Sequence, residues 1–145
     1  MDIPAVIHGA GGFVRTLGPR VLSTEPEVVL RLDAGEELHN HVGGPHAAAI
    51  FGLGETAAFS LLLRDFGDLV EDGAIPLVKD ASIGYSSIAT GVLLATATFT
   101  GDPDGVRASL AERGRATFPV EVRIRREEDG VETALATYRM ALLRA

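Results

Sequence analysis

The sequence contains no cysteine in its 145 residues. Disulfide bonds, thiolate nucleophiles and cysteine-ligated zinc are therefore excluded, while a reducing compartment stays compatible with the chain. Basic residues are also scarce, since 13 Lys and Arg stand against 20 Asp and Glu, and the formal net charge is −7. Proteins that follow nucleic-acid phosphates usually carry a basic stripe. We therefore expect no nucleic-acid partner.

We expect neither an export signal nor a membrane anchor from the sequence. Asp2 stands where a signal peptide needs positive charge, and the apolar run at the amino terminus stops at His8. The longest apolar stretch, residues 47–63, has seventeen residues and includes Glu55, whereas a transmembrane helix needs about 20 apolar residues. The sequence therefore predicts a cytoplasmic protein with no membrane partner.

What the sequence does contain is the pattern of one mixed domain over residues 1–145. Hydrophobic residues make up 46% of the chain, which suffices for a single core. Residues 1–25 have a helix-like spacing interrupted by glycines and predict a short N-terminal helical cap, and residues 47–63 predict a long buried helix. Alternating residues predict strands near 28–32, 77–85, 91–100, 118–125 and 131–143.

The connections between these strands indicate how they pair. They are short, and parallel neighbours would need a crossover of a dozen or more residues, so antiparallel pairing is expected. Residues 101–116 are expected to form a turn with one helical turn, and residues 126–130 a hairpin turn ending in Asp-Gly. The fold class is therefore predicted as α+β, with one antiparallel sheet of about five strands wrapped around the long helix. The open sheet edges predict a subunit interface.

Polar residues with chemical potential gather around the start of the long helix. Asn40 and His46 precede it, and Glu55 lies inside it. A carboxylate in an apolar helix is either hydrogen-bonded as a structural group or functional with a raised pKa, and the isolation of Glu55 favours the second interpretation. The amides of Ala47 and Ala48, at the positive end of the helix dipole, could hold an oxyanion.

The spacing of His46 and Glu55 limits how they can cooperate. They are nine residues apart, which on one helix separates them by about 13.5 Å along the axis and, at about 100° per residue, places them on opposite sides. One chain cannot easily bring them together. If both serve one site, a second copy of the chain must supply one of them, most simply across a twofold axis.

The segment NHVGGPHAAAIFGLGETAA, residues 40–58, resembles the active-site segment of hotdog-fold acyl-CoA thioesterases of the phenylacetate-pathway (PaaI-like) group. That group shows Asn, a Gly, then His followed by small residues, with Asp or Glu nine positions after the His. The segment YSSIATGVLLATA, residues 85–97, is similar to a strand of the same family. The matched residues are Asn40, Gly43, His46, Ala47 and Glu55, then Tyr85, Ala89, Gly91, Leu93 and Ala95. The resemblance implies a hotdog core over residues 26–143, preceded by the cap.

The resemblance further implies hydrolysis of an acyl-CoA by a homodimer or a homotetramer, at a site built from two subunits. Glu55 would be the nucleophile or the general base that activates water, and the Ala47 amide would polarise the thioester carbonyl. Asn40 and His46 would shape the same pocket. The implied substrate-binding residues are Gly43, Tyr85, Ser87 and Ala89. No metal and no cofactor is implied, because coenzyme A is part of the substrate.

Coenzyme A is a polyanion, so a protein of net negative charge needs a local basic patch to bind it. The candidate residues are Arg107, Arg113, Arg115, Arg123, Arg125 and Arg126.

Three alternatives are compatible with parts of the sequence. His39, His41 and His46 have a spacing that could belong to a metal site such as those of cupin barrels, although no later histidine completes the set. GLGETA, residues 52–57, imitates a dinucleotide-binding fingerprint without the surrounding βαβ alternation. A hotdog domain that binds an acyl or aromatic ligand without catalysis is the alternative from another functional class.

Overall fold

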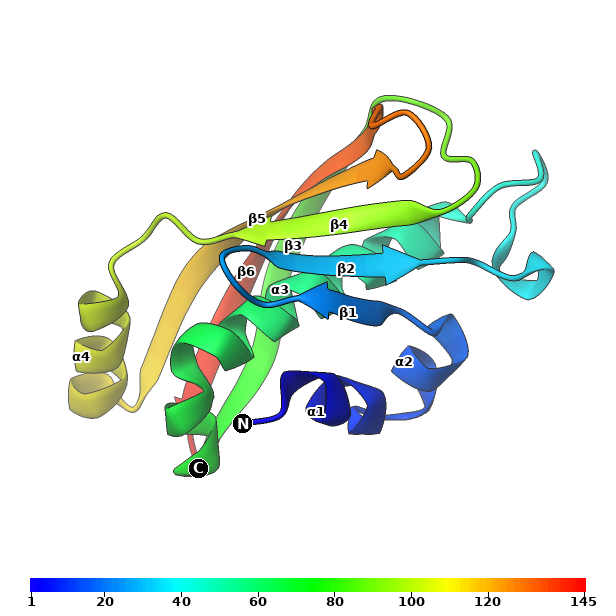
Figure 1. The fold of residues 1–145 in the computed structure, drawn as a ribbon. Coiled ribbons are helices and arrows are strands. Elements are labelled where there is room, and N and C mark those ends of the chain that lie inside the picture. Colours follow the sequence, from blue (N-terminus) through cyan, green and yellow to red (C-terminus); the bar gives the residue numbers. More distant parts are fainter.

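A six-stranded sheet curves around one long helix in the computed structural model, which describes residues 1–145 (Figure 1). In chain order the strands are β1 (Arg20–Ser23), β2 (Val28–Leu32), β3 (Ala74–Tyr85), β4 (Leu93–Thr98), β5 (Arg115–Arg126) and β6 (Glu132–Arg144). The helices are α1 (Ile3–Gly9), α2 (Gly12–Leu17), α3 (Ala47–Glu71) and α4 (Pro103–Arg113), with a 3-10 turn at Glu36–Leu38. The predicted α+β class, with an antiparallel sheet around a long helix and a helical cap, is confirmed. The predicted bounds of the cap, residues 1–25, are wrong, because its helices end at Leu17 and Arg20–Ser23 pairs with β2 in the sheet.

The sheet has six strands, where about five were predicted. The order is β1-β2-β4-β5-β6-β3, and every neighbouring pair is antiparallel. The additional strand is β1, whose four residues alternate only between exposed and half-buried positions, so no apolar run marks it in the sequence. In β2 the predicted alternation is clear, because Val28, Leu30 and Leu32 are fully buried. β1 and β3 form the two edges.

The core is built on α3, which is longer than the predicted 47–63 and runs for 25 residues. A non-helical conformation at Phe66 kinks it near its end. By length and hydropathy alone α3 could cross a bilayer, but 67% of its most apolar 18-residue window is buried within the protein. This burial is what a central core helix requires.

Gly54 allows α3 to approach β6 closely. A Cβ at this position would overlap the hydroxyl of Tyr138 and lie 3.0 Å from the ring carbon Cε2. Tyr138 is fully buried, and its hydroxyl donates to the Phe51 carbonyl at 2.7 Å. The absence of a side chain at Gly54 therefore sets the distance between the helix and the sheet beside Glu55.

Gly54→Ala is expected to lower the free energy of unfolding by about 1–3 kcal/mol, because the buried Tyr138 ring has no free space to move into. Urea unfolding measures this change. Gly9→Ala is the control, since a Cβ there meets nothing within 4 Å. Adding Tyr138→Phe to Gly54→Ala removes the overlapping oxygen. The double variant should therefore lose less free energy of unfolding than the sum of the losses in the two single variants. A Gly54→Ala protein as stable as wild type would contradict the close approach.

The connection between β4 and β5 is a correction to the sequence prediction. Residues 101–116 were expected to hold one helical turn, whereas α4 has 11 residues. Its start is capped by the Asp102 side chain, and its end by Gly114 in a left-handed conformation with φ 69°. Only Val106 and Leu110 are buried. Two apolar positions are too few to produce a visible helical period, which explains why the helix was missed.

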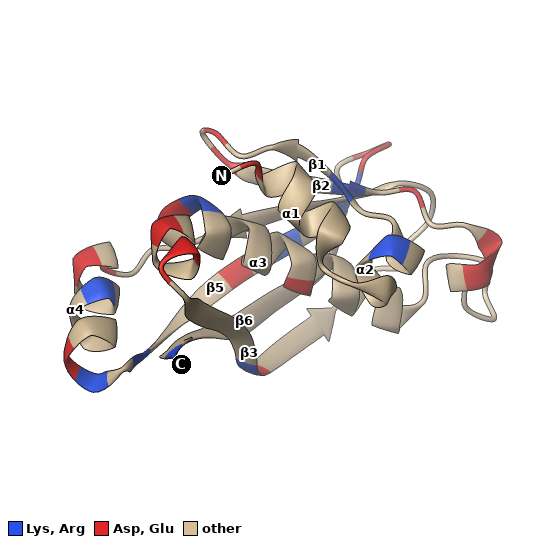
Figure 2. Ribbon diagram, turned by 90° about the horizontal axis from the view of Figure 1, so that it is seen from below, with Lys and Arg blue, Asp and Glu red and all other residues tan.

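Charged residues gather where α4 meets the last turns of α3 (Figure 2). Arg107 donates to the Asp68 carboxylate at 2.6 Å, and its guanidinium lies 5.5 Å from the centre of the Phe66 ring. The hydrogen bond from Arg107 lowers the pKa of Asp68. These contacts fasten α4 to the kinked end of α3, at the end of the helix opposite the candidate site.

Candidate active site

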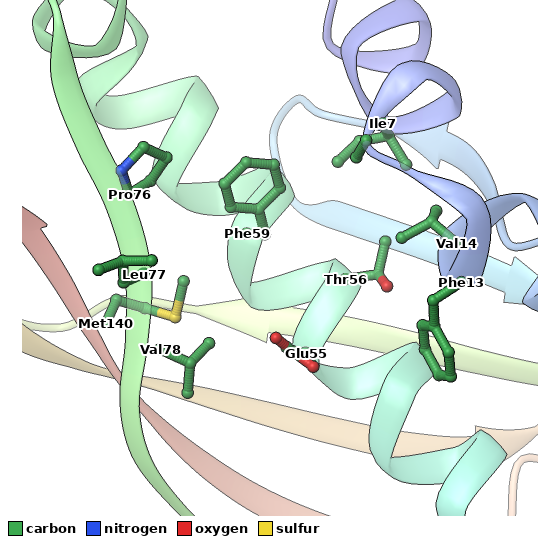
Figure 3. A pocket seen from close by; sticks show the side chains of 11 residues that line it. Ile7, Phe13, Val14, Glu55, Thr56, Phe59, Pro76, Leu77, Val78 and Met140 are labelled. Carbon is green, nitrogen blue, oxygen red and sulfur yellow. The ribbon is translucent and has the colours of Figure 1, made fainter.

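Glu55 lies in the third turn of α3, on the wall of a cavity of about 330 Å³. Figure 3 shows its carboxylate between α3, the N-terminal helices and β3. Apart from Glu55 and Thr56 the lining is apolar: Ile7, Ala10, Phe13, Val14, Phe59, Pro76, Leu77, Val78 and Met140. The Thr56 hydroxyl donates to the Gly52 carbonyl at 2.7 Å, so it is engaged by the helix itself.

The surroundings of Glu55 disfavour its charged form. The side chain is half-buried, and no basic residue lines the cavity. Burial alone raises the pKa of the Glu55 carboxyl above its ordinary value of 4.5. A general base works best when its pKa approaches the operating pH, so this environment suits a carboxylate that accepts a proton during a reaction.

The start of α3 is capped by His46. Its Nδ1 accepts a hydrogen bond from the Ala48 amide at 2.9 Å, so the neutral ring carries its proton on Nε2. The expectation that the Ala48 amide is free is therefore wrong, because the imidazole occupies it. Ala47 is exposed and is the first residue of the helix, where an N–H has no helical carbonyl partner.

A tight loop places Asn40 beside the start of α3. The Asn40 Oδ1 accepts from the amides of Val42 and Gly44, at 3.0 and 3.3 Å. Gly43 has φ 79°, a left-handed conformation that glycine adopts without strain. A Cβ at Gly44 would overlap the carbonyl oxygen of Ala89. Asn40 therefore organises the loop, and Gly44 lets the loop contact the segment that follows β3.

Tyr85, the last residue of β3, connects the two segments on which the resemblance rests. Its hydroxyl donates to the Ala47 carbonyl at 3.0 Å. A cavity of about 420 Å³ lies beside this bond. Five of the sequence-predicted site residues line it together: Asn40, Ala47, Tyr85, Ser87 and Ala89.

The other predicted residues lie elsewhere. Gly43 is exposed in the loop, and His46 lines a separate cavity of about 210 Å³. Glu55 lines neither of these cavities. Within one chain the Glu55 carboxylate and the start of α3 thus belong to different cavities, in agreement with the spacing argument.

The structure disagrees with two of the alternatives. The His39 Nε2 lies 3.0 Å from the Ala34 carbonyl and the His46 Nδ1 is bound to the Ala48 amide, and no three potential metal-binding side chains of this chain converge. Residues 52–57 lie inside α3, whereas a dinucleotide fingerprint must occupy a turn between a strand and a helix.

Four of the six candidate arginines have polar partners in the chain. Arg107 pairs with Asp68, Arg123 with Glu132, and Arg126 with Asp129, while Arg125 donates to the Thr96 hydroxyl. Arg113 and Arg115 flank Gly114 at the junction of α4 and β5.

Sequence reasoning missed the apolar residues that surround Glu55. Phe13 comes from α2, Val78 from β3 and Met140 from β6. Their positions in the sequence carry no mark of this role, because tertiary packing alone brings these distant segments to Glu55. The helical spacing of the N-terminal segment was the one signal in the sequence for this cavity, because it predicted a helical cap on the core.

The antiparallel sheet wrapped around α3 is the hotdog fold of the thioesterase superfamily. The chain belongs to the family described as "Domain of unknown function (DUF4442)", which it matches over residues 5–142. No curated protein matches the sequence.

Solved structures of other proteins share this fold. A Pseudomonas aeruginosa protein of unknown function, described as a "probable thioesterase", is 26% identical with a TM-score of 0.80, over 99% of this chain and 94% of that one. A Chlorobaculum tepidum protein of unknown function is 11% identical with a TM-score of 0.85, over 99% and 93%. Zebrafish thioesterase superfamily member 2 is 22% identical with a TM-score of 0.72, over 97% and 95%. The neighbours support a thioesterase-type activity at the level of the superfamily.

Proposed function

We propose that the protein hydrolyses the thioester bond of an acyl-CoA. The observation that carries this proposal is the half-buried Glu55 carboxylate, which has a raised pKa and no basic residue in its apolar cavity, on a fold shared with thioesterases. The resemblance of residues 40–58 favours the PaaI-like group. Coenzyme A is part of the substrate, no other cofactor is proposed, and the cytoplasm is the proposed location.

In the proposed reaction Glu55 acts as nucleophile or general base. As a base, it takes a proton from water while the water oxygen attacks the thioester carbonyl carbon. The Ala47 amide donates to the oxyanion that forms, and the C–S bond then breaks to release a carboxylic acid and the coenzyme A thiol. As a nucleophile, a Glu55 oxygen attacks the thioester carbonyl carbon, the C–S bond breaks to release the coenzyme A thiolate, and a mixed anhydride remains. When water then attacks the Glu55 carbonyl carbon of this anhydride, a single turnover in labelled water leaves the label in the Glu55 carboxylate, which the general-base route does not.

The remaining site residues are proposed to form the binding surface around this chemistry. Asn40 and His46 are proposed to shape the pocket, and their hydrogen bonds to the amides of Gly44 and Ala48 support this role. The proposed substrate-binding residues are Gly43, Tyr85, Ser87 and Ala89. Arg113 and Arg115 are the candidate arginines without a polar side-chain partner in the chain. They lie beside the C-terminal end of α3, far from its start, so a phosphate contact from them is proposed only across the subunit interface.

We propose a homodimer as the functional unit, with a tetramer as the larger assembly. β3 is a 12-residue edge strand, and Ile75, Leu77 and Tyr85 on it are exposed. Unpaired edges invite pairing with a second chain, and a twofold pair is the commonest solution. Antiparallel α3 helices in such a pair would bring the start of one helix towards the middle of the other. Ala47 and Glu55 of different subunits could then serve one thioester.

Incubation with short, medium-length and aromatic acyl-CoAs tests the proposal. We expect release of the coenzyme A thiol, detected with a thiol reagent, from at least one class. The matched control is the protein with Glu55→Gln, which should bind the same thioester without releasing the thiol. Binding without thiol release by wild type across the whole panel would instead identify a non-catalytic hotdog domain.

A further inference from the structure

Phe13 separates two cavities along α3. It lies in the first turn of α2, and its ring rests on Gly52, where a Cβ would lie 3.0 Å from the ring atom Cε1. The ring lines both the Glu55 cavity of about 330 Å³ and the adjoining cavity of about 210 Å³ that contains His46. In Figure 3 the ring lies on the side of the Glu55 cavity that α2 contributes. Phe13 is thus a wall that the two cavities share.

We propose that the Glu55 cavity receives the acyl chain of the substrate, and that Phe13 is a specificity-determining residue that limits the length of this chain. The inference rests on the proposed thioesterase function and adds the substrate class, an uncharged aliphatic acyl group. The occupant follows from the position of the cavity, because a thioester carbonyl beside Glu55 leaves its acyl chain next to the apolar lining.

The chemistry of the cavity lining disfavours acyl chains that end in a charged group. Glu55 is the only ionisable residue in it, and the Thr56 hydroxyl is engaged with the Gly52 carbonyl. A carboxylate at the far end of an acyl chain would lose its hydration without gaining a partner. It would also be repelled by Glu55. A methyl-ended chain meets only apolar side chains such as Phe59 and Met140.

The packing of α2 allows Phe13 to be replaced by a smaller residue without displacing the helix. Phe13 is 64% exposed, whereas Leu17, one helical turn later, is 4% exposed and also contacts the position of Gly52. Leu17 therefore keeps α2 on α3 when Phe13 is shortened. Loss of the Phe13 ring joins the two cavities into a longer one that runs along α3 towards His46.

Calorimetric titration with S-alkyl-CoA thioethers tests the inference without any catalytic step, because a methylene replaces the thioester carbonyl. The affinity of wild type should rise about fourfold per added methylene, up to a limiting length. In the Phe13→Ala variant this rise should continue for about two further methylenes, and in Phe13→Leu for fewer. Val6→Ala is the control, since Val6 lies on α1 but lines neither cavity. Circular dichroism verifies that each variant is folded.

The titrations test the role of Phe13, the apolar substrate class and the thioesterase function separately. The same limiting length in wild type, Phe13→Leu and Phe13→Ala would overturn the role of Phe13. Equal affinity for thioethers that end in a methyl group and in a carboxylate would overturn the apolar substrate class. In both cases the thioesterase proposal survives, because coenzyme A is still bound. Failure of every thioether to bind wild type would instead overturn the proposed function, and the inference with it.

Discussion

Glu55→Gln is expected to lower kcat for thioester hydrolysis about a thousandfold, because the amide can neither accept the proton nor attack the carbonyl carbon. Gln has nearly the same shape, so KM should change little. The measurement is steady-state thiol release from the preferred acyl-CoA. Glu71→Gln, at the exposed end of the same helix, is the matched control and should retain full activity. Full activity of the Glu55→Gln protein would disprove the role of this carboxylate.

The raised pKa of Glu55 adds a pH dependence with a defined sign. The rate should fall with decreasing pH as the carboxylate is protonated, at a pH above the ordinary Glu value of 4.5. At a pH between the ordinary pKa of Glu and the raised pKa of Glu55, the folded protein keeps a proton that the unfolded chain has released. The free energy of unfolding of wild type therefore declines as the pH rises through this interval. Glu55→Gln removes this decline. Its melting temperature should therefore exceed that of wild type at neutral pH, and the difference should shrink in acid.

Ala47→Pro should lower kcat about 10²–10³-fold, because proline lacks the amide hydrogen that stabilises the oxyanion. The position tolerates proline structurally, since it is the first residue of α3. The preceding His46 already has φ −63° and ψ 146°, the extended conformation favoured before proline. The variant also keeps the carbonyl of residue 47, which accepts the hydrogen bond from the Tyr85 hydroxyl. Ala47→Ser keeps the amide hydrogen and should remain active, whereas equal losses in both variants would assign the effect to the side chain.

Mixing the two inactive variants tests whether subunits share the site. If Glu55 of one subunit works with Ala47 of the other, a mixed dimer contains one intact site and one doubly altered site. After unfolding and refolding together, about a quarter of all sites should be intact in a random mixture of dimers. If both residues act within one chain, no activity returns. Light scattering on the same samples establishes whether the assembly is a dimer or a tetramer.

The fold could be predicted from the sequence to the extent that its signals are local. The alternation of Val28, Leu30 and Leu32 marks β2, and the apolar run from Ala47 marks α3, because each depends only on neighbouring residues and one buried face. β1 and α4 escaped prediction for the same reason. β1 has two exposed and two half-buried residues, and α4 buries only two apolar side chains.

The candidate site shows the same division. Glu55 stands out in the sequence as the one charged residue within seventeen, and the nine-residue spacing to His46 already predicted that one chain separates them. The Ala48 amide was predicted to be free, but the His46 side chain folds back onto it. The side-chain conformation of His46 determines whether the Ala48 amide is free, and the sequence pattern does not predict that conformation.

The sequence by itself determined the mixed class, the antiparallel pairing, the buried central helix and the isolated carboxylate, because these follow from periodicity and from the cost of burying a charge. Tertiary structure alone decided what surrounds that carboxylate. The walls of its cavity come from α1, α2, β3 and β6, and Gly52 and Gly54 set how closely α2 and β6 approach the helix. Such contacts depend on how side chains from distant segments fill space together, and no local pattern encodes that.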